Sequence, residues 1–365
     1  RSRSGSTYGS TNALMLEPAF IGVDNAYGNY RAPTEDIFNL WKERNNASVD
    51  IYSNIWAWLY ETINAANTII GRAENEGISW TEEEKNLVLA EARCIRAWAY
   101  RHLTYLWGDV PLTVEESSGS NIKTDWERTP VAEVRRVMEE DWLFAEAHLP
   151  VEPSSPGRVI KGLVQHYLAE LYLAMDDPEK AREAALRVIQ EPAYQLVTQR
   201  YGAGTGSPGT PFTDMFLSGN ANRSEGNTEA LWVIQNEQNV IGGEGYNIMA
   251  RYWINRYYSL RVGGENPVMV TGENGGRGIG RLGPTKFAID LYEPGDDRGS
   301  PYAWRFFWQI NNPDGIPEGY ELGDTIYLDT TSVETLTNPN WPHTRKWDHV
   351  NPIDPSSATQ YNDQV

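Results

Sequence analysis

Tyrosines and tryptophans gather in three loop-rich stretches, and their ring faces could bind a ligand without any bond-breaking chemistry. The candidates are Tyr27, Tyr30 and Trp41 near the start, Tyr252, Trp253, Tyr257 and Tyr258 in the middle, and Trp304, Trp308 and Tyr320 further on. A sugar ring stacks its C–H face on an indole or phenol, while nearby Asn, Asp, Arg and backbone groups bond its hydroxyls. A competing interpretation is that RYWINRYY, residues 251–258, is a strand or helix whose rings are half buried in a core.

The composition supports the ring-lined site and speaks against nucleic acid as a partner. The chain has 14 Trp and 20 Tyr beside 8 Phe, a bias toward rings with one polar edge. Its formal charge is −19, from 50 acidic against 31 basic residues, so it has no basic stripe to neutralise nucleic-acid phosphates. A neutral glycan needs no basic patch and suits this charge.

A glycine-rich motif could suggest dinucleotide binding, but its context does not fit. Residues 278–283, GIGRLG, match the GxGxxG pattern. A dinucleotide site needs a preceding strand and a helix that opens within the pattern, whereas Pro284 starts the next expected helix and no βαβ series surrounds it. We therefore expect a flexible loop.

Acidic residues offer a weak case for catalysis. Asp290, Glu293, Asp296 and Asp297 crowd one stretch, but a glycosidase needs two carboxyls that face each other across a cleft. A helix end followed by a turn, with Arg298 paired to an acid, is the simpler interpretation. A calcium site built on the aspartates is a weak alternative, and no other metal or cofactor is expected.

Other catalytic motifs are missing from the sequence. There is no GxSxG elbow and no HExxH, and one cysteine with five histidines excludes a Cys-based zinc site. We therefore expect a binding protein and not an enzyme.

One helix must organise the scaffold that positions these rings. Residues 88–107 are apolar on nearly every face, which predicts a helix buried between neighbours. Thr81 followed by three glutamates predicts its start, and Gly108 with Pro111 predicts its end. Arg93 and Arg96 lie inside this apolar helix, so each must find a carboxylate or a carbonyl. Cys94 is expected to be a small core residue.

Further helices are predicted on both sides of this one. A helix over 49–74 should pair with it as a hairpin, and another should run from Thr129-Pro130 to the residue before Pro150. Segments 161–175 and 177–191 match the spacing of a tetratricopeptide repeat at Leu168, Ala169, Tyr172, Ala181 and Ala185. Beyond about residue 195, glycine-rich loops separate short elements, among them a strand over 230–235 and a helix over 284–292.

Residues 91–112, EARCIRAWAYRHLTYLWGDVPL, resemble the hallmark of the SusD/RagB family, cell-surface nutrient-binding lipoproteins of Bacteroidota. Segments 56–70, 161–190, 230–239 and 282–307 resemble the same family in the same order. The resemblance implies a mainly α-helical fold in which tetratricopeptide-like helix pairs form a superhelical wall beside a loop-rich irregular subdomain with short strands. Residues 1–365 would form one SusD-like domain. Residues 48–193 would be its scaffold, and 1–47 with 194–365 its ligand-binding part.

The resemblance also implies a location and partners. Family members sit at the outer-membrane surface through a lipidated cysteine, absent from this sequence, and pass their nutrient to a TonB-dependent transporter of the SusC type. They normally continue, after a stretch like HTRKWDHVNPID, into a final repeat helix. This chain stops about where that helix would begin, so we expect some apolar surface to be left uncovered.

The expected function is capture of an oligosaccharide for delivery to that transporter. Two alternatives stay open. A repeat scaffold, or a peptide-capturing SusD/RagB relative, would bind peptides on concave helix faces and would need Asn, Arg and Lys there. A glycoside hydrolase would release products from a polysaccharide.

Overall fold

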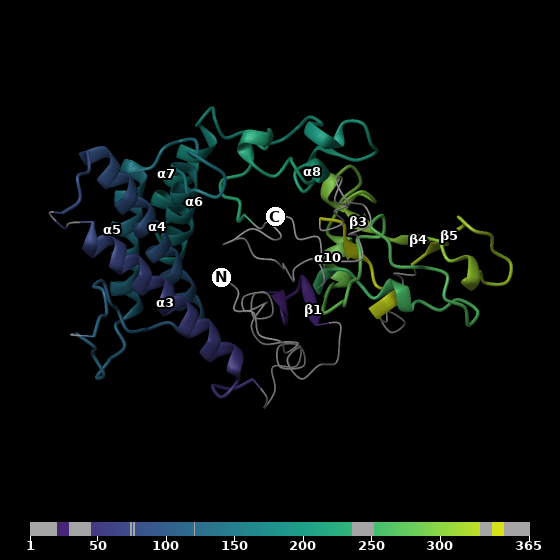
Figure 1. The fold of residues 1–365 in the computed structure, drawn as a ribbon, viewed down its shortest axis with the longest axis horizontal. Helices are drawn as coiled ribbons and strands as arrows, with labels where there is room; N and C mark the ends of the chain where they lie inside the picture. Colours follow the sequence, from purple (N-terminus) through teal and green to yellow (C-terminus); the bar gives the residue numbers. More distant parts are fainter. Residues whose placement is uncertain are drawn as a thin grey trace. The chain divides into compact units, whose positions relative to one another are not determined.

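The computed structural model describes residues 20–28, 45–73, 75, 77–119, 121–235, 252–328 and 338–346. The chain forms two compact units. Ser53–Leu196 with Thr228–Ile234 make the helical unit, and Arg1–Tyr52, Val197–Asn227 and Gln235–Val365 make the loop-rich unit. Figure 1 shows the long helices of the first and the short elements of the second.

Five long helices give a mainly α-helical fold, as predicted. They are α3 (Asp50–Arg72), α4 (Glu82–Trp107), α5 (Val131–His148), α6 (Lys161–Ala174) and α7 (Pro178–Ile189). From α4 to α7 each helix packs against the next, and Figure 1 shows them side by side. Within the described residues, no helix is long and apolar enough to cross a membrane.

The α6–α7 pair is built on the residues expected of a tetratricopeptide-like unit. Leu168 and Tyr172 of α6 are buried, and so are Ala181 and Ala184 of α7. Small side chains on α7 let the two helices approach closely. Ala184 takes the buried position that the repeat spacing assigned to Ala185, which is half buried.

Helix α4 begins and ends where the sequence predicts. The Thr81 hydroxyl accepts from the Glu84 amide and the Glu84 carboxylate accepts from the Thr81 amide, a complete capping box. Gly108 ends the helix with a φ of 68°. Edge-to-face pairs between Trp56 and Trp107 and between Trp58 and Trp98 pack α3 against α4, as expected of the predicted hairpin.

The two arginines inside α4 find the partners they require. Arg96 donates to both Asp141 oxygens of α5 at 2.8 and 2.7 Å and to Asn67 of α3 at 2.8 Å. The Arg93 guanidinium lies 4.2 Å from the centre of the Phe144 ring. Because Arg96 and Asp141 are both buried, the pair ties α3, α4 and α5 into one arrangement.

Three local predictions need correction. Pro130, not Thr129, is the N-cap of α5, because Thr129 pairs with Val110 in an isolated β-bridge. The helix expected over 284–292 is the shorter α10 (Lys286–Asp290), because Pro284 belongs to a strand. Segment 230–235 is not a strand. Its Trp232 donates to the Gly157 carbonyl at 3.0 Å and packs edge-to-face on Trp98. These side-chain contacts position the segment, and not the backbone hydrogen bonds of a strand pair.

In the loop-rich unit, the described strands form three antiparallel pairs. They are β1 (Ala26–Gly28) with β2 (Leu282–Pro284), β3 (Trp304–Arg305) with β6 (His343–Thr344), and β4 (Phe307–Gln309) with β5 (Thr325–Tyr327). A hydrophobic core that includes Tyr257 and Trp308 lies beside them.

The GxGxxG segment is a packed loop and not the flexible one we expected. A Cβ on Gly278 would lie 2.1 Å from the Ile254 carbonyl oxygen, and the Gly280 amide donates to that oxygen at 2.9 Å. Gly283 lies in β2. Because these glycines have no side chain, the backbones of the two segments can approach each other closely.

Candidate functional site

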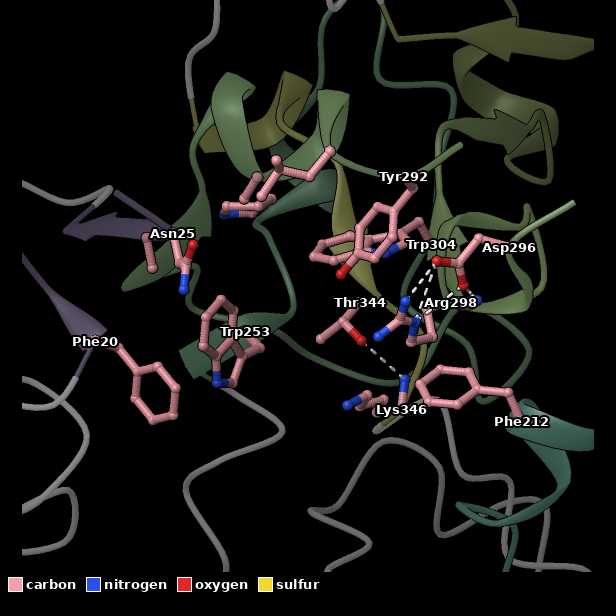
Figure 2. Close-up of a pocket in the computed structure, with 15 residues that line it drawn as sticks. Phe20, Asn25, Phe212, Trp253, Tyr292, Asp296, Arg298, Trp304, Thr344 and Lys346 are labelled. Atoms are coloured by element: carbon pink, nitrogen blue, oxygen red, sulfur yellow. Dashed lines mark hydrogen bonds and ion pairs between the residues drawn. The ribbon is translucent and has the colours of Figure 1, made fainter. Parts of the chain in front are cut away.

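An open cavity of about 570 Å³ lies within the loop-rich unit. Its volume falls in the range of small-molecule sites, roughly 300–1,000 Å³. It is lined by Phe20, Asn25, Ala26, Phe212, Trp253, Pro284, Ala288, Leu291, Tyr292, Asp296, Arg298, Ala303, Trp304, Thr344 and Lys346. Figure 2 shows rings and polar groups from many short segments meeting there.

The β3–β6 pair places Trp304 at the cavity. Trp304 is opposite Thr344 in the ladder, and both side chains line the cavity. Their neighbours Arg305 and His343 form the next pair and are buried. Successive side chains of a strand point to opposite faces. Trp304 and Thr344 therefore face the cavity, whereas Arg305 and His343 face the other side of the strand pair.

Three more rings surround the same space. Tyr292, just beyond α10, tilts against Trp304 with ring centres 6.3 Å apart. Trp253 and Phe20 form an edge-to-face pair with ring centres 5.7 Å apart. Trp253, Tyr292 and Trp304 are half buried and Phe20 is more exposed, so each keeps ring surface open to a ligand.

Polar groups sit among the rings. Asp296 and Arg298 form a close ion pair at 2.7 Å within a 3-10 turn, η4 (Asp297–Gly299). The hydrogen bonds from Arg298 hold the pKa of Asp296 below its usual range. Among the described residues that line the cavity, Asp296 is the only carboxylate. A general acid needs a raised pKa, so this pair suits hydrogen bonding to hydroxyls and not proton transfer.

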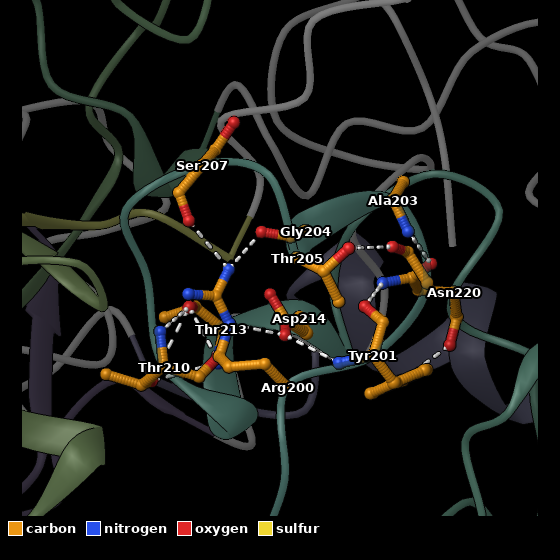
Figure 3. A network of polar contacts seen from close by, with 11 residues as sticks. Arg200, Tyr201, Ala203, Gly204, Thr205, Ser207, Thr210, Thr213, Asp214 and Asn220 are labelled. Carbon is orange, nitrogen blue, oxygen red and sulfur yellow. Dashed lines mark hydrogen bonds and ion pairs between the residues drawn. The ribbon is translucent and has the colours of Figure 1, made fainter.

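A polar network surrounds the buried Asp214, the last residue of the short helix that contains Phe212 (Figure 3). Arg200 donates to the buried carboxylate of Asp214 at 2.6 Å, and the Tyr201 amide donates to the same oxygen at 3.1 Å. Asn220 accepts from the Ala203 amide at 2.9 Å. This network fixes the short helix α8 (Pro211–Asp214) that presents Phe212.

Two of the ten predicted ring residues, Trp253 and Trp304, come together at the cavity. Tyr252, Tyr257 and Trp308 are at most 3% exposed, which corrects their assignment as platforms. Tyr257 stacks on Trp308 with ring centres 4.2 Å apart, because that pair fills the core of the unit. For Tyr252 and Tyr257, this burial agrees with the alternative interpretation of residues 251–258 as a segment whose rings lie in a core.

Three of the other predicted residues, Tyr27, Tyr258 and Tyr320, are outside the cavity lining. Tyr30 and Trp41 lie outside the described residues. Tyr27 packs edge-to-face on Trp341, and the Tyr258 hydroxyl donates to the Gly278 carbonyl at 3.0 Å. Tyr320 is exposed in a turn but lines no part of this cavity.

Among the lining residues that sequence reasoning missed are Asn25, Thr344, Phe20, Phe212, Tyr292 and Lys346. Tyr292 was read only as part of a helix end, although it lies in a segment that resembles the SusD/RagB family. Phe212 is a lone ring after a glycine-rich stretch, a signal that could have been used. Nothing in the local sequence marks Phe20 or Lys346.

Comparison with known proteins identifies the class of protein. Residues 22–173 match the model of a SusD-like family described as starch-binding and associating with the outer membrane. SusD-like protein P2 of Formosa agariphila is 33% identical over 157 residues, which are 42% of this chain and 30% of that protein. The match thus spans less than a third of that relative's length.

Solved structures agree on the fold. A SusD superfamily protein from Parabacteroides distasonis aligns with a TM-score of 0.69 at 19% identity, over 98% of this chain and 67% of that one. A structure with xylogluco-oligosaccharide aligns with a TM-score of 0.54 at 21% identity, over 75% of this chain and 50% of the other. Residues 22–173 therefore resemble the SusD-like family, and the chain shares the fold of solved SusD superfamily proteins.

Proposed function

We propose that this protein binds an oligosaccharide in the cavity lined by Trp253, Tyr292 and Trp304. The observation that carries the proposal is the convergence of partly open rings on a space that also contains Asn25, Asp296, Arg298 and Thr344. Aromatic faces take the C–H surface of a pyranose, and the amide, carboxylate, guanidinium and hydroxyl bond its edge. The family, and a fold shared with a structure that contains a xylogluco-oligosaccharide, support the same ligand class.

The proposed role is binding without bond cleavage. Glycoside hydrolysis in most families uses two carboxyls on opposite sides of the scissile bond. The described lining of the cavity offers one, Asp296, and the hydrogen bonds from Arg298 lower the pKa of that carboxyl. We therefore assign capture and not turnover to this site.

Isothermal titration calorimetry on a panel of oligosaccharides tests this role. For a ligand that binds, Trp304→Ala and Trp253→Ala should each weaken binding by about tenfold or more, since stacking on an aromatic ring contributes on the order of 1–1.5 kcal/mol. Trp126→Ala is the matched control, because Trp126 is an exposed tryptophan of the helical unit. Absence of saccharide binding, or equal binding by all three variants, would overturn the proposal.

We also propose that the full protein acts at the outer-membrane surface and passes its ligand to a TonB-dependent transporter of the SusC type. The family's description as associating with the outer membrane supports the location. Co-expression with a SusC-type transporter from the same organism should yield a complex that survives purification. Two separate proteins under those conditions would contradict the transfer step.

A further inference from the structure

Lys346 brings a positive charge to the cavity that no carboxylate neutralises within the described part of the chain. The residue follows β6 and is half buried. Its ammonium lies 5.2 Å from the centre of the Phe212 ring and 4.7 Å from that of Phe216. Figure 2 shows it beside Phe212 and Thr344 on the cavity wall.

The aromatic rings offset only part of the hydration free energy that this ammonium loses on burial. A cation over an aromatic face gains roughly 0.5–2 kcal/mol, whereas removal of an ammonium from water costs several. Consistent with that deficit, burial lowers the pKa of Lys346. Lys180 also lies over a ring, that of Tyr172, but its ammonium has carboxylates within 3.6–3.7 Å, those of Asp177 and Glu139.

The charged groups of the cavity leave one net positive charge. Asp296 and Arg298 neutralise each other through their ion pair. Lys346 is the remaining charged residue among the described lining residues, in a chain whose formal charge is −19. The net charge of these lining residues is thus opposite in sign to that of the whole chain, and a bound ligand would lie closest to the lining charges.

We propose that the cavity selects an acidic glycan, whose sugar carboxylate or sulfate pairs with Lys346 while the pyranose ring stacks on the tryptophans. This inference rests on the proposed function and specifies its substrate class. It differs from the neutral glycan expected from overall charge, because a charge inside the binding site decides which ligand group is stabilised there. An oxyanion bound at Nζ would supply the partner that the described residues do not provide.

The test is calorimetric titration with matched pairs of oligosaccharides. One pair is an oligogalacturonide and its fully methyl-esterified form, and the other is a sulfated galactan oligosaccharide and its desulfated form. The acidic member of at least one pair should bind on the order of tenfold more tightly than its neutral partner. The pair that shows the preference identifies the carboxylate or the sulfate as the recognised group.

Substitutions assign that preference to Lys346. Lys346→Gln should bind the acidic and neutral forms equally, and Lys346→Arg should keep the preference because it keeps the charge. Lys180→Gln is the matched control and should bind like the unmodified protein. Circular dichroism establishes that each variant is folded.

The outcomes separate the two proposals. Equal binding of acidic and neutral forms, lost in Trp304→Ala, overturns the acidic-glycan inference and leaves the proposed function intact. A preference that persists in folded Lys346→Gln also overturns the inference. If no oligosaccharide of either kind binds, the proposed function fails and the inference fails with it.

Discussion

Trp304 and Trp308 are the same residue type in neighbouring strands, yet one lines the cavity and the other is fully buried. The difference lies in their cross-strand partners. Trp304 is opposite Thr344, whereas Trp308 is opposite Ile326 and stacks on Tyr257. The strand pair to which each tryptophan belongs therefore decides which of the two rings can contact a ligand.

This contrast predicts different stability effects for the same substitution. Trp308→Ala should lower the free energy of unfolding by about 3–5 kcal/mol, because it leaves a cavity in the core. Trp304→Ala should cost about 1 kcal/mol or less, because its ring is half exposed. Urea unfolding followed by circular dichroism measures both. Similar losses for the two variants would contradict the distinction between core and cavity wall.

Ring exposure was only partly predictable from the sequence for the same reason. The clustering of Tyr and Trp is visible locally and indicated Trp253 and Trp304, which line the cavity. That Tyr252, Tyr257 and Trp308 are core depends on contacts with distant segments, such as Trp308 with Ile326, which no local pattern reveals.

At the scale of elements, the helices were predictable wherever local signals set their ends. The capping box at Thr81 and the glycine at 108 define α4 without tertiary information. The errors fall where pairing overrides local preference: Thr129 joins a bridge with Val110, and Pro284 joins a strand with Ala26.

The close contact between the glycine loop at 278–283 and the Ile254 backbone predicts that a side chain at position 278 destabilises the protein. Gly278→Ala should destabilise the protein by about 1–3 kcal/mol or more, because the added methyl would lie 2.1 Å from the Ile254 carbonyl oxygen. Gly206→Ala is the control, since a Cβ there meets nothing within 4 Å. Chemical denaturation compares them. A neutral Gly278→Ala would show that the two segments are not in close contact.

The buried Arg96–Asp141 pair predicts a non-additive result. Arg96→Met alone should cost about 3–5 kcal/mol, because it leaves the Asp141 carboxylate buried without its partner. A second change, Asp141→Leu, should recover much of that loss by removing the stranded charge. A double-mutant cycle by denaturant unfolding measures the coupling, and simple additivity would contradict a direct pair.

At the scale of the whole molecule, the single cysteine reports on the helical unit. Cys94 is 1% exposed, and burial raises the pKa of its thiol to about 12. A thiol reagent at pH 8 should therefore leave the native protein unmodified and react fully after denaturation. Absorbance of the released chromophore follows the reaction, and rapid labelling of native protein would mean that α4 is not buried.

Overall charge and local charge give different expectations for the ligand. The acidic composition speaks against nucleic acid as a partner and favours a neutral glycan. The cavity contains a lysine that lacks a carboxylate partner among the described residues, and a charge count over the whole chain averages such a local feature away.

A crystal structure of the protein with a bound oligosaccharide tests the central claim most directly. We predict a sugar ring stacked on Trp304 or Trp253 within the cavity, with an acidic group of the ligand near Lys346. A saccharide bound on the helical unit, with this cavity left free of it, would contradict the account.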